Sequence, residues 1–313
     1  MQEELLNWKS KGNYFRFRGY DIFYIKEGVG PTLTIFHGYP YSSFDFIKIW
    51  HELTSKFSVI VLDMLGMGFS DKPENHHYSF EEMADIYAAI FEKLNISETH
   101  ILSHDLGNSV VQELLARNEE DENLFKIKSI TFLNGGLFTD VYKPRLIQIL
   151  LSKSPKPIGK ILSRLMSKKN VAKATSEVFG KDTQPSEELL QNFWDILNYK
   201  NGKSIAYLIG RLVFAKDQYQ LRWISAMQRT VIPMCFINGP ADPNSGMHMA
   251  KRYKQLIPEA NVKILNINIG HWPQIEAPME TLHVFYLFLI QLKPIIEINK
   301  DRMYENQIFY KSK

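Results

Sequence analysis

The sequence predicts an α/β protein with a mostly parallel sheet that helices cover on both faces. Short apolar runs of strand length alternate with amphipathic stretches of helical period, which is the pattern of such a sheet. The apolar runs end in loops rich in glycine and polar residues, where the active sites of these sheets lie. The alternation stops between about 137 and 229, where only helical periodicity remains. We therefore expect core segments at 1–136 and 230–295, an inserted helical cap at 137–229 and a polar tail at 296–313.

The first core segment begins with alternating aromatic residues broken by Gly19, which predicts a hairpin over residues 14–26. Four apolar runs then predict strands that are buried on both faces, with amphipathic helices between them. Ser79, followed by Glu81 and Glu82, is a favourable start for one of these helices. The strands are expected at 32–36, 57–62, 100–103 and 127–133, and the helices at 44–53, 79–94 and 110–116.

The same alternation resumes after the insertion. Strands are expected at 232–238 and 262–267, and helices at 247–256 and 278–292. The single cysteine, Cys235, lies inside the first of these strands, so we expect a buried packing residue rather than a reactive thiol.

Composition excludes several classes of protein. Hydrophobic residues make up 45% of the chain and charged residues 23%, which is ordinary for a soluble globular protein. A net charge of +3 is too small to indicate nucleic-acid binding. No apolar stretch is long enough for a membrane span, and Met1 is followed by no basic segment of the kind that begins a signal peptide. We expect a cytoplasmic protein with no metal and no cofactor, and the sequence leaves its oligomeric state open.

The most informative stretch is residues 101–111, where an apolar strand end meets the start of a helix. Asp105 stands at the centre of the turn, with the small residues Ser103 and Gly107 on either side. This is the layout of a nucleophile elbow, in which a tight strand-to-helix turn lifts one side chain clear of the sheet. An aspartate that caps an ordinary helix explains these residues alone about equally well.

Three further loops favour the elbow. The loop 238–243 offers the carboxylate of Asp242, the loop 269–273 offers the imidazole of His271, and the loop 37–40 offers a backbone N–H. Asp242 taken alone could be a turn former, and His271 taken alone an ordinary loop histidine. Together, in the chain order nucleophile, acid and histidine and each after a strand, they indicate a catalytic triad of the α/β-hydrolase type.

These motifs resemble the epoxide hydrolase and haloalkane dehalogenase branch of the α/β hydrolases. The resemblance spans about residues 14–292 and is strongest to the mesoderm-specific transcript proteins. Those relatives carry an apolar membrane segment near the N-terminus that this chain lacks, so their membrane location is not implied. The branch-wide similarity lies in residues 37–40, 63–73, 103–107 and 270–271, and the closer one in 102–105, 134–138, 222–223, 239–243 and 273–279.

An aspartate nucleophile implies attack on a saturated carbon, which gives an ester between the substrate and Asp105. Water activated by His271 would then attack the carboxyl carbon, while Asp242 orients and stabilises the imidazole. The backbone N–H groups of Tyr39 and Leu106 would hold the oxyanion of this second step. The expected substrate is a small apolar molecule with an epoxide or another leaving group on carbon.

The resemblance favours an epoxide over a halide. Dehalogenases usually have tryptophan directly after the nucleophile and often asparagine before the proline of the first loop, where this chain has Leu106 and Tyr39. A dehalogenase with an atypical halide site and a non-catalytic binding protein remain alternatives.

Epoxide hydrolases protonate the departing oxygen with tyrosines of the cap. We rank Tyr207 and Tyr219 first, because they precede Trp223 near the return to the core. The family's Trp-Tyr pair reads Trp223-Ile224 here, so one acidic tyrosine is missing. Further candidates for substrate contact or proton donation are Tyr142, Tyr199 and Trp223 in the cap and His37, His104 and Trp272 in the core loops.

Overall fold

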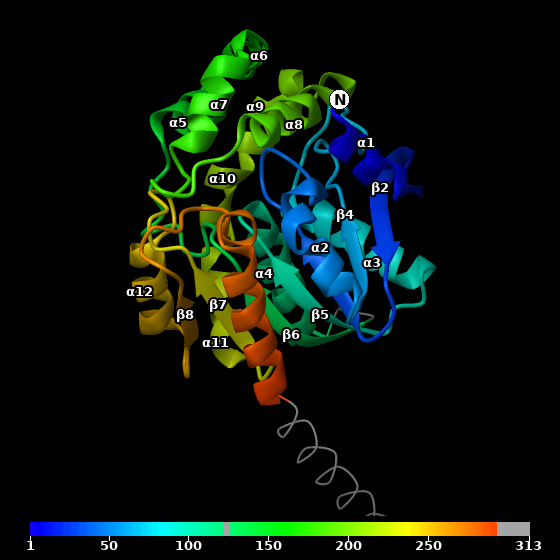
Figure 1. Ribbon diagram of the computed structural model, residues 1–313, viewed down its shortest axis with the longest axis vertical. Helices are drawn as coiled ribbons and strands as arrows, with labels where there is room; N and C mark the ends of the chain where they lie inside the picture. The colour runs from blue at the N-terminus through cyan, green and yellow to red at the C-terminus, as the bar shows by residue number, and fades with distance from the viewer. Residues whose placement is uncertain (122–124, 293–313) are drawn as a thin grey trace, which may run out of the picture.

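The computed structural model describes residues 1–121 and 125–292, so the expected tail at 296–313 lies outside the described residues. Its centre is one eight-stranded sheet with the order β1-β2-β4-β3-β5-β6-β7-β8 (Figure 1). The first two pairings are antiparallel and the other five are parallel, which confirms the predicted mostly parallel sheet. The strands are β1 (Asn13–Phe17), β2 (Tyr20–Glu27), β3 (Thr32–Phe36), β4 (Ser58–Leu62), β5 (Glu98–Ser103), β6 (Lys126–Phe132), β7 (Met234–Asn238) and β8 (Asn261–Ile264).

The central strands are apolar because both of their faces are buried. In β4, Val59 and Val61 belong to the hydrophobic cluster on one side of the sheet, whereas Ile60 and Leu62 belong to the cluster on the other. Successive side chains of a strand point to opposite faces, so a strand between two helix layers needs an unbroken apolar run.

Helices cover both faces of the sheet (Figure 1). Ser79 caps α3 (Phe80–Lys93) by accepting a hydrogen bond from the backbone N–H of Glu82, as its sequence indicates. Helix α1 (Glu3–Ser10) was not expected from the sequence; its Trp8 packs edge-on against Phe44 and Trp50. One face carries α3 (Phe80–Lys93), α4 (Leu106–Glu119), α11 (Gln220–Arg229) and α12 (Met247–Leu256), and the other carries α1 (Glu3–Ser10), η1 (Ser43–Phe46), α2 (Ile47–Thr54), α13 (Pro273–Glu276) and the helix at 278–292.

The inserted helices gather at one end of the molecule, beyond the carboxyl ends of the parallel strands (Figure 1). Helix α11 differs from them, because it packs against α4 in the helix layer of the core. The chain has therefore rejoined the core layer by Gln220, inside the stretch expected to form the cap. The inserted helices are α5 (Leu146–Lys153), α6 (Lys156–Leu165), α7 (Lys168–Ser176), α8 (Glu187–Asn198), η2 (Tyr199–Ile205), α9 (Ala206–Gly210), α10 (Leu212–Ala215) and η3 (Lys216–Gln218).

Within residues 1–121 and 125–292, no helix combines the length and the apolar character that a membrane crossing requires.

Candidate active site

Asp105 occupies a sharp turn between β5 and α4. Its backbone has φ 47° and ψ −112°, a conformation that costs a non-glycine residue free energy and recurs at functional sites. The turn also brings α4 very close to β3: a Cβ atom on Gly107 would lie 2.5 Å from the carbonyl oxygen of Phe36. Glycine is therefore required two residues after Asp105, and the strained turn holds the Asp105 side chain away from the sheet.

The two carboxylate oxygens of Asp105 have different surroundings. Oδ2 accepts a hydrogen bond of 3.0 Å from the backbone N–H of Tyr39. Oδ1 lies 3.8 Å from Nε2 of His271. Leu106, the other expected oxyanion donor, follows Asp105 in the chain as the first residue of α4 and is buried. One oxygen is thus fixed by the backbone, while the other faces the imidazole.

His271 and Asp242 form a buried pair. Nδ1 of His271 lies 2.8 Å from Oδ2 of Asp242. Asp242 also accepts hydrogen bonds from the backbone N–H of Asn244 and from the hydroxyl of Ser245. Burial raises the pKa of the Asp242 carboxyl, but the charge and hydrogen bond of His271 outweigh it and lower this pKa to about 2. Asp242 is therefore an anion at neutral pH.

The same charges act on His271 in the opposite direction. Burial lowers the pKa of this imidazole, but the charge and hydrogen bond of Asp242 and then the charge of Asp105 raise it to about 9. His271 is therefore protonated at neutral pH as long as both carboxylates carry their charge.

Sequence reasoning missed Asn134, which connects three parts of the site. Its carbonyl oxygen accepts the backbone N–H of Asp105 at 2.8 Å. Its side-chain amide donates to the carbonyl of Gly239 and, at 3.2 Å, to the carboxylate of Asp242. The available signal was its position directly after a buried strand, the position that also singled out the other site residues.

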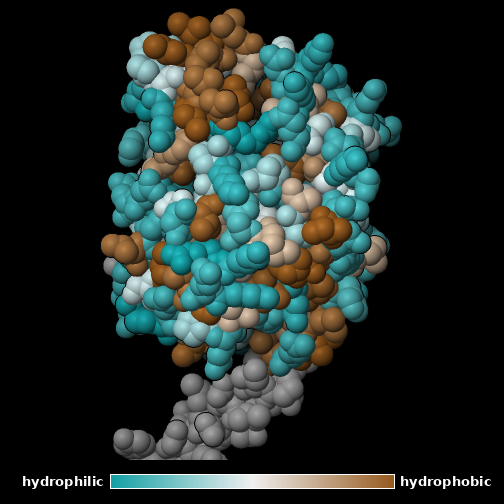
Figure 2. Space-filling model, turned by 90° about the vertical axis from the view of Figure 1, so that its left-hand side faces the viewer, coloured by the Kyte–Doolittle hydropathy of each residue, from teal (hydrophilic) through white to brown (hydrophobic). Residues whose placement is uncertain are grey.

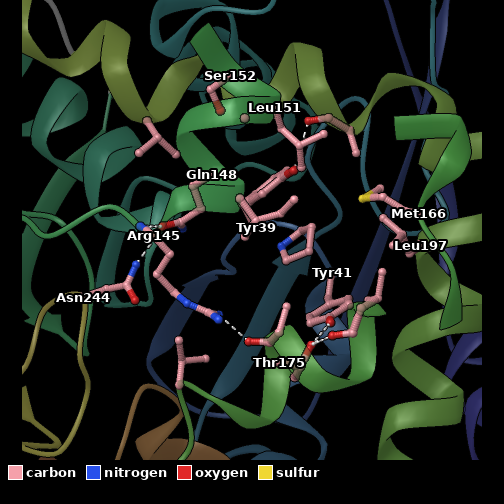
Figure 3. Close-up of a pocket in the computed structure, with 18 of the residues that line it drawn as sticks. Tyr39, Tyr41, Arg145, Gln148, Leu151, Ser152, Met166, Thr175, Leu197 and Asn244 are labelled. Atoms are coloured by element: carbon pink, nitrogen blue, oxygen red, sulfur yellow. Dashed lines mark hydrogen bonds between the residues drawn. The ribbon is translucent and has the colours of Figure 1, made fainter. Parts of the chain in front are cut away.

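Asp105 and His271 line a cavity of about 330 Å³ between the core loops and the inserted helices. This volume is within the range of small-molecule sites. Most of its lining is apolar and comes from the cap, including Leu151, Leu162 and Met166. Figure 3 shows Tyr39 and Tyr41, from the loop after β3, facing the same space. The arrangement suits an apolar ligand that presents one reactive group to Asp105.

Tyr142, ranked below other cap tyrosines from the sequence, lines this cavity together with Asp105. Its hydroxyl oxygen accepts hydrogen bonds from the side-chain amides of Gln148 at 3.2 Å and Asn244 at 3.1 Å. Burial, followed by the charge of Asp105, raises the pKa of this phenol. Tyr142 therefore keeps its proton, and because its oxygen is an acceptor in both contacts, that proton is free to be donated.

The tyrosines ranked first do not line the cavity. The ring of Tyr207 packs against Gly159. Tyr219 stacks on Trp223 with a ring separation of 4.9 Å, and the indole N–H of Trp223 donates to Glu113 in the core. Tyr219 and Trp223 lie in the helix layer of the core rather than in the cavity lining, because α11 packs on α4.

Tyr199 and the remaining core candidates occupy distinct positions. Tyr199 stacks edge-on against Phe69 and is not part of the cavity lining. Trp272 lines the cavity beside His271. His37 and His104 are fully buried, and burial lowers the pKa of both, that of His104 to about 3.

The imidazoles of these two neutral histidines each form a hydrogen bond with a backbone group of another loop. Nε2 of His37 accepts the N–H of Met64 at 2.9 Å, which joins the loops after β3 and β4. Nε2 of His104 lies 2.8 Å from the carbonyl oxygen of His271 and fixes the loop that carries this imidazole.

Lys216 is a second site residue that the sequence did not signal. Its side chain is buried beneath the cap, and Nζ donates to the carbonyl of Gly136 at 3.2 Å. Burial lowers the pKa of this amine to about 8, although the charge of Asp105 opposes the shift. No cluster of metal-ligating side chains occurs in the part of the chain that the structure describes.

Comparison with known proteins finds similarity over most of the chain. A family model described as alpha/beta hydrolase fold matches residues 31–278. The human mesoderm-specific transcript homolog protein is 38% identical over 295 residues, which cover 91% of this chain and 88% of that protein. These matches include both core segments and the inserted helices.

Two solved structures share the fold at low sequence identity. The epoxide hydrolase CorEH superposes with a TM-score of 0.72 at 17% identity and covers 90% of this chain and 99% of its own. The haloalkane dehalogenase DatA from Agrobacterium tumefaciens superposes with a TM-score of 0.74 at 18% identity, with coverages of 90% and 97%. The chain therefore belongs to the α/β-hydrolase-fold family.

Proposed function

We propose that this protein hydrolyses an apolar epoxide to a diol through an ester formed on Asp105. The observation that carries the proposal is the environment of the Asp105 carboxylate. One oxygen is held by a backbone N–H, the other faces His271, and both belong to a residue that lines an apolar cavity. A carboxylate in this position is a nucleophile for saturated carbon.

In the first half of the reaction, Oδ1 of Asp105 attacks an epoxide carbon and the carbon–oxygen bond of the ring breaks. The leaving alkoxide is too basic to depart unaided and takes the proton of Tyr142. The His271 imidazolium then supplies the proton that the resulting phenolate needs. The ester has removed the negative charge of Asp105, and this loss favours the neutral imidazole.

In the second half, neutral His271 takes a proton from water as the water oxygen attacks the ester carbon. The oxyanion forms on Oδ2, which already accepts the N–H of Tyr39. As this intermediate collapses, the bond between its carbon and the substrate oxygen breaks, and that oxygen takes the second proton of the water; the diol leaves, the Asp105 carboxylate is restored, and His271 is again an imidazolium. Atoms and charges balance over the cycle, which adds one water to one epoxide.

The test is to trap the ester. Replacing His271 with Gln removes the base of the second half, so an epoxide substrate accumulates as an adduct of Asp105. Mass spectrometry of digested protein should find the added mass on the peptide with Asp105, and the double variant His271→Gln, Asp105→Asn should lose it. An adduct on Ser103, or the absence of both adduct and diol across an epoxide panel, would contradict the proposal.

Tyr142→Phe tests the acid. Epoxide opening should fall by roughly two to four orders of magnitude, the usual contribution of a positioned acid. Tyr41→Phe is the matched control, because Tyr41 lines the same cavity but its hydroxyl pairs with Thr175. Halide release from haloalkanes should be unaffected by either change, since halide leaves without a proton. Epoxide turnover that survives Tyr142→Phe would place the acid elsewhere, and halide release without diol formation would favour a dehalogenase.

A further inference from the structure

Large apolar side chains are exposed on α5 and α6, the two helices that cover the outer side of the cavity. Leu146 is 77% exposed and Leu165 is 71% exposed. On α6 the exposed residues recur at the spacing of one helix face. Figure 2 shows apolar side chains gathered at this end of the molecule, with hydrophilic residues on both sides. We call this surface the apolar cap face; it consists of Leu146, Ile147, Leu150, Ile158, Ile161 and Leu165.

The surroundings of the apolar cap face are strongly basic. Residues 141–176 contain nine Lys and Arg residues and no Asp or Glu. The whole chain has a net charge of +3, so subtracting +9 leaves a net −6 for the rest. Two of the basic side chains are neutralised locally, because Lys160 pairs with Glu74 and Arg145 with Glu177. Exposed side chains without an acidic partner in the described residues include Lys153, Lys156, Lys168, Lys169 and Lys173.

The apolar cap face is continuous with the cavity. Ile147 and Leu165 are exposed on this face and also line the cavity that contains Asp105. At these two residues, an apolar molecule can therefore pass from the surface to the cavity lining without leaving apolar side chains.

From these observations we propose that the protein docks through the apolar cap face on a lipid surface that carries anionic headgroups. Helices with an apolar face flanked by lysine and arginine lie in the interface of such surfaces, with the apolar side chains inserted and the cations at the headgroups. A second copy of the chain is disfavoured as occupant, because two faces of the same strong positive charge repel each other. The docking is independent of the reaction proposed for Asp105.

The experiment is flotation of the full-length protein with vesicles of pure phosphatidylcholine and with vesicles that also contain phosphatidylserine. Binding should require the anionic lipid and weaken as salt increases, because the charge contribution is screened. Equal binding to both vesicles, or none to either, would overturn the proposal. No substrate is present, so the outcome does not depend on turnover.

Two sets of variants test separately how the inserted apolar side chains and the positive charges contribute to vesicle binding. Changing Leu146, Leu150, Ile158 and Ile161 to Gln removes apolar residues that do not line the cavity, and should lower the partition coefficient at least about tenfold. The matched control changes Leu221 and Val231 to Gln, which are even more exposed but lie outside the inserted helices. Loss of binding in the control as well would contradict the assignment of the surface.

The charge set reverses Lys156 and Lys169 to Glu and should also lower binding at least about tenfold. Its control reverses the exposed Lys251 and Lys254 of α12. Light scattering of the same proteins without vesicles measures whether the chain forms a dimer, which tests a second copy as the alternative occupant of this face. A dimer that the four Gln changes dissociate, together with vesicle binding that they leave intact, would assign this face to self-association instead.

Discussion

Replacing Asp105 with Asn should lower the pKa of His271, because Asp105 is one of the charges that raise it to about 9. The imidazole and the carboxylate are 3.8 Å apart. At this separation Coulomb's law gives about 1 kcal/mol in a water-like medium and roughly 4 kcal/mol at an effective dielectric constant of about 20. Since about 1.4 kcal/mol corresponds to a factor of ten, His271 should bind its proton roughly fivefold to a thousandfold more weakly.

The assay is an NMR titration of the imidazole nitrogens of His271, with the resonance assigned by its disappearance in the Gln variant. Asn keeps the shape of the side chain and an oxygen that can accept the N–H of Tyr39. The exposed Asp182→Asn is the matched control and should leave the midpoint unchanged. An unchanged midpoint in Asp105→Asn would refute the reasoning that ester formation converts His271 from an acid into a base.

Three other outcomes are expected. Cys235 is fully buried, and burial raises its pKa to about 12, so thiol reagents should label it slowly in the native protein and rapidly after unfolding; fast native labelling would contradict a packing role. Gly107→Ala should lower the denaturation midpoint markedly, because the new Cβ would lie 2.5 Å from a backbone oxygen. Gly19→Ala is its control: the new Cβ would have no atom within 4 Å, so this variant measures the effect of a positive φ alone. The raised pKa of His271 contributes stability that is fully present below about pH 6.5 and is lost as pH rises through about 9, so a Gln variant should show a flatter loss of stability over this window in urea titrations.

The sequence predicted the elements whose local signals agree with their tertiary surroundings. The bounds of β3 and α12 match the expected ranges 32–36 and 247–256. Helix α1 was missed because only Leu5 and Trp8 of its eight residues are buried, which is too weak a pattern to read. Strand β8 is shorter than expected, because it lies at the edge of the sheet and pairs only with β7.

The ranking of cap tyrosines illustrates what linear order cannot supply. Tyr219 was favoured because it precedes the return to the core, but it lies at the start of α11, whose contacts with α4 direct it toward Phe80. Tyr142 reaches the cavity through contacts with Gln148 and Asn244, which come from different parts of the chain. The direction of a side chain in an inserted helical unit depends on such packing, which periodicity does not encode.

The position of α11 also bears on how this architecture can diversify. Parallel neighbours such as β6 and β7 need a crossover helix, and α11 already provides one, packed on α4. Everything between Gly136 and Gln220 is then an elongated loop of that crossover. Asn134 joins the carboxyl ends of β6 and β7, since its side-chain nitrogen donates to the carbonyl of Gly239 and its side-chain oxygen accepts the N–H of Gly239. Exchanging the loop for one from another chain would alter the cavity while the β6–α11–β7 unit stays closed, so selectivity and the scaffold of the reacting groups can evolve separately.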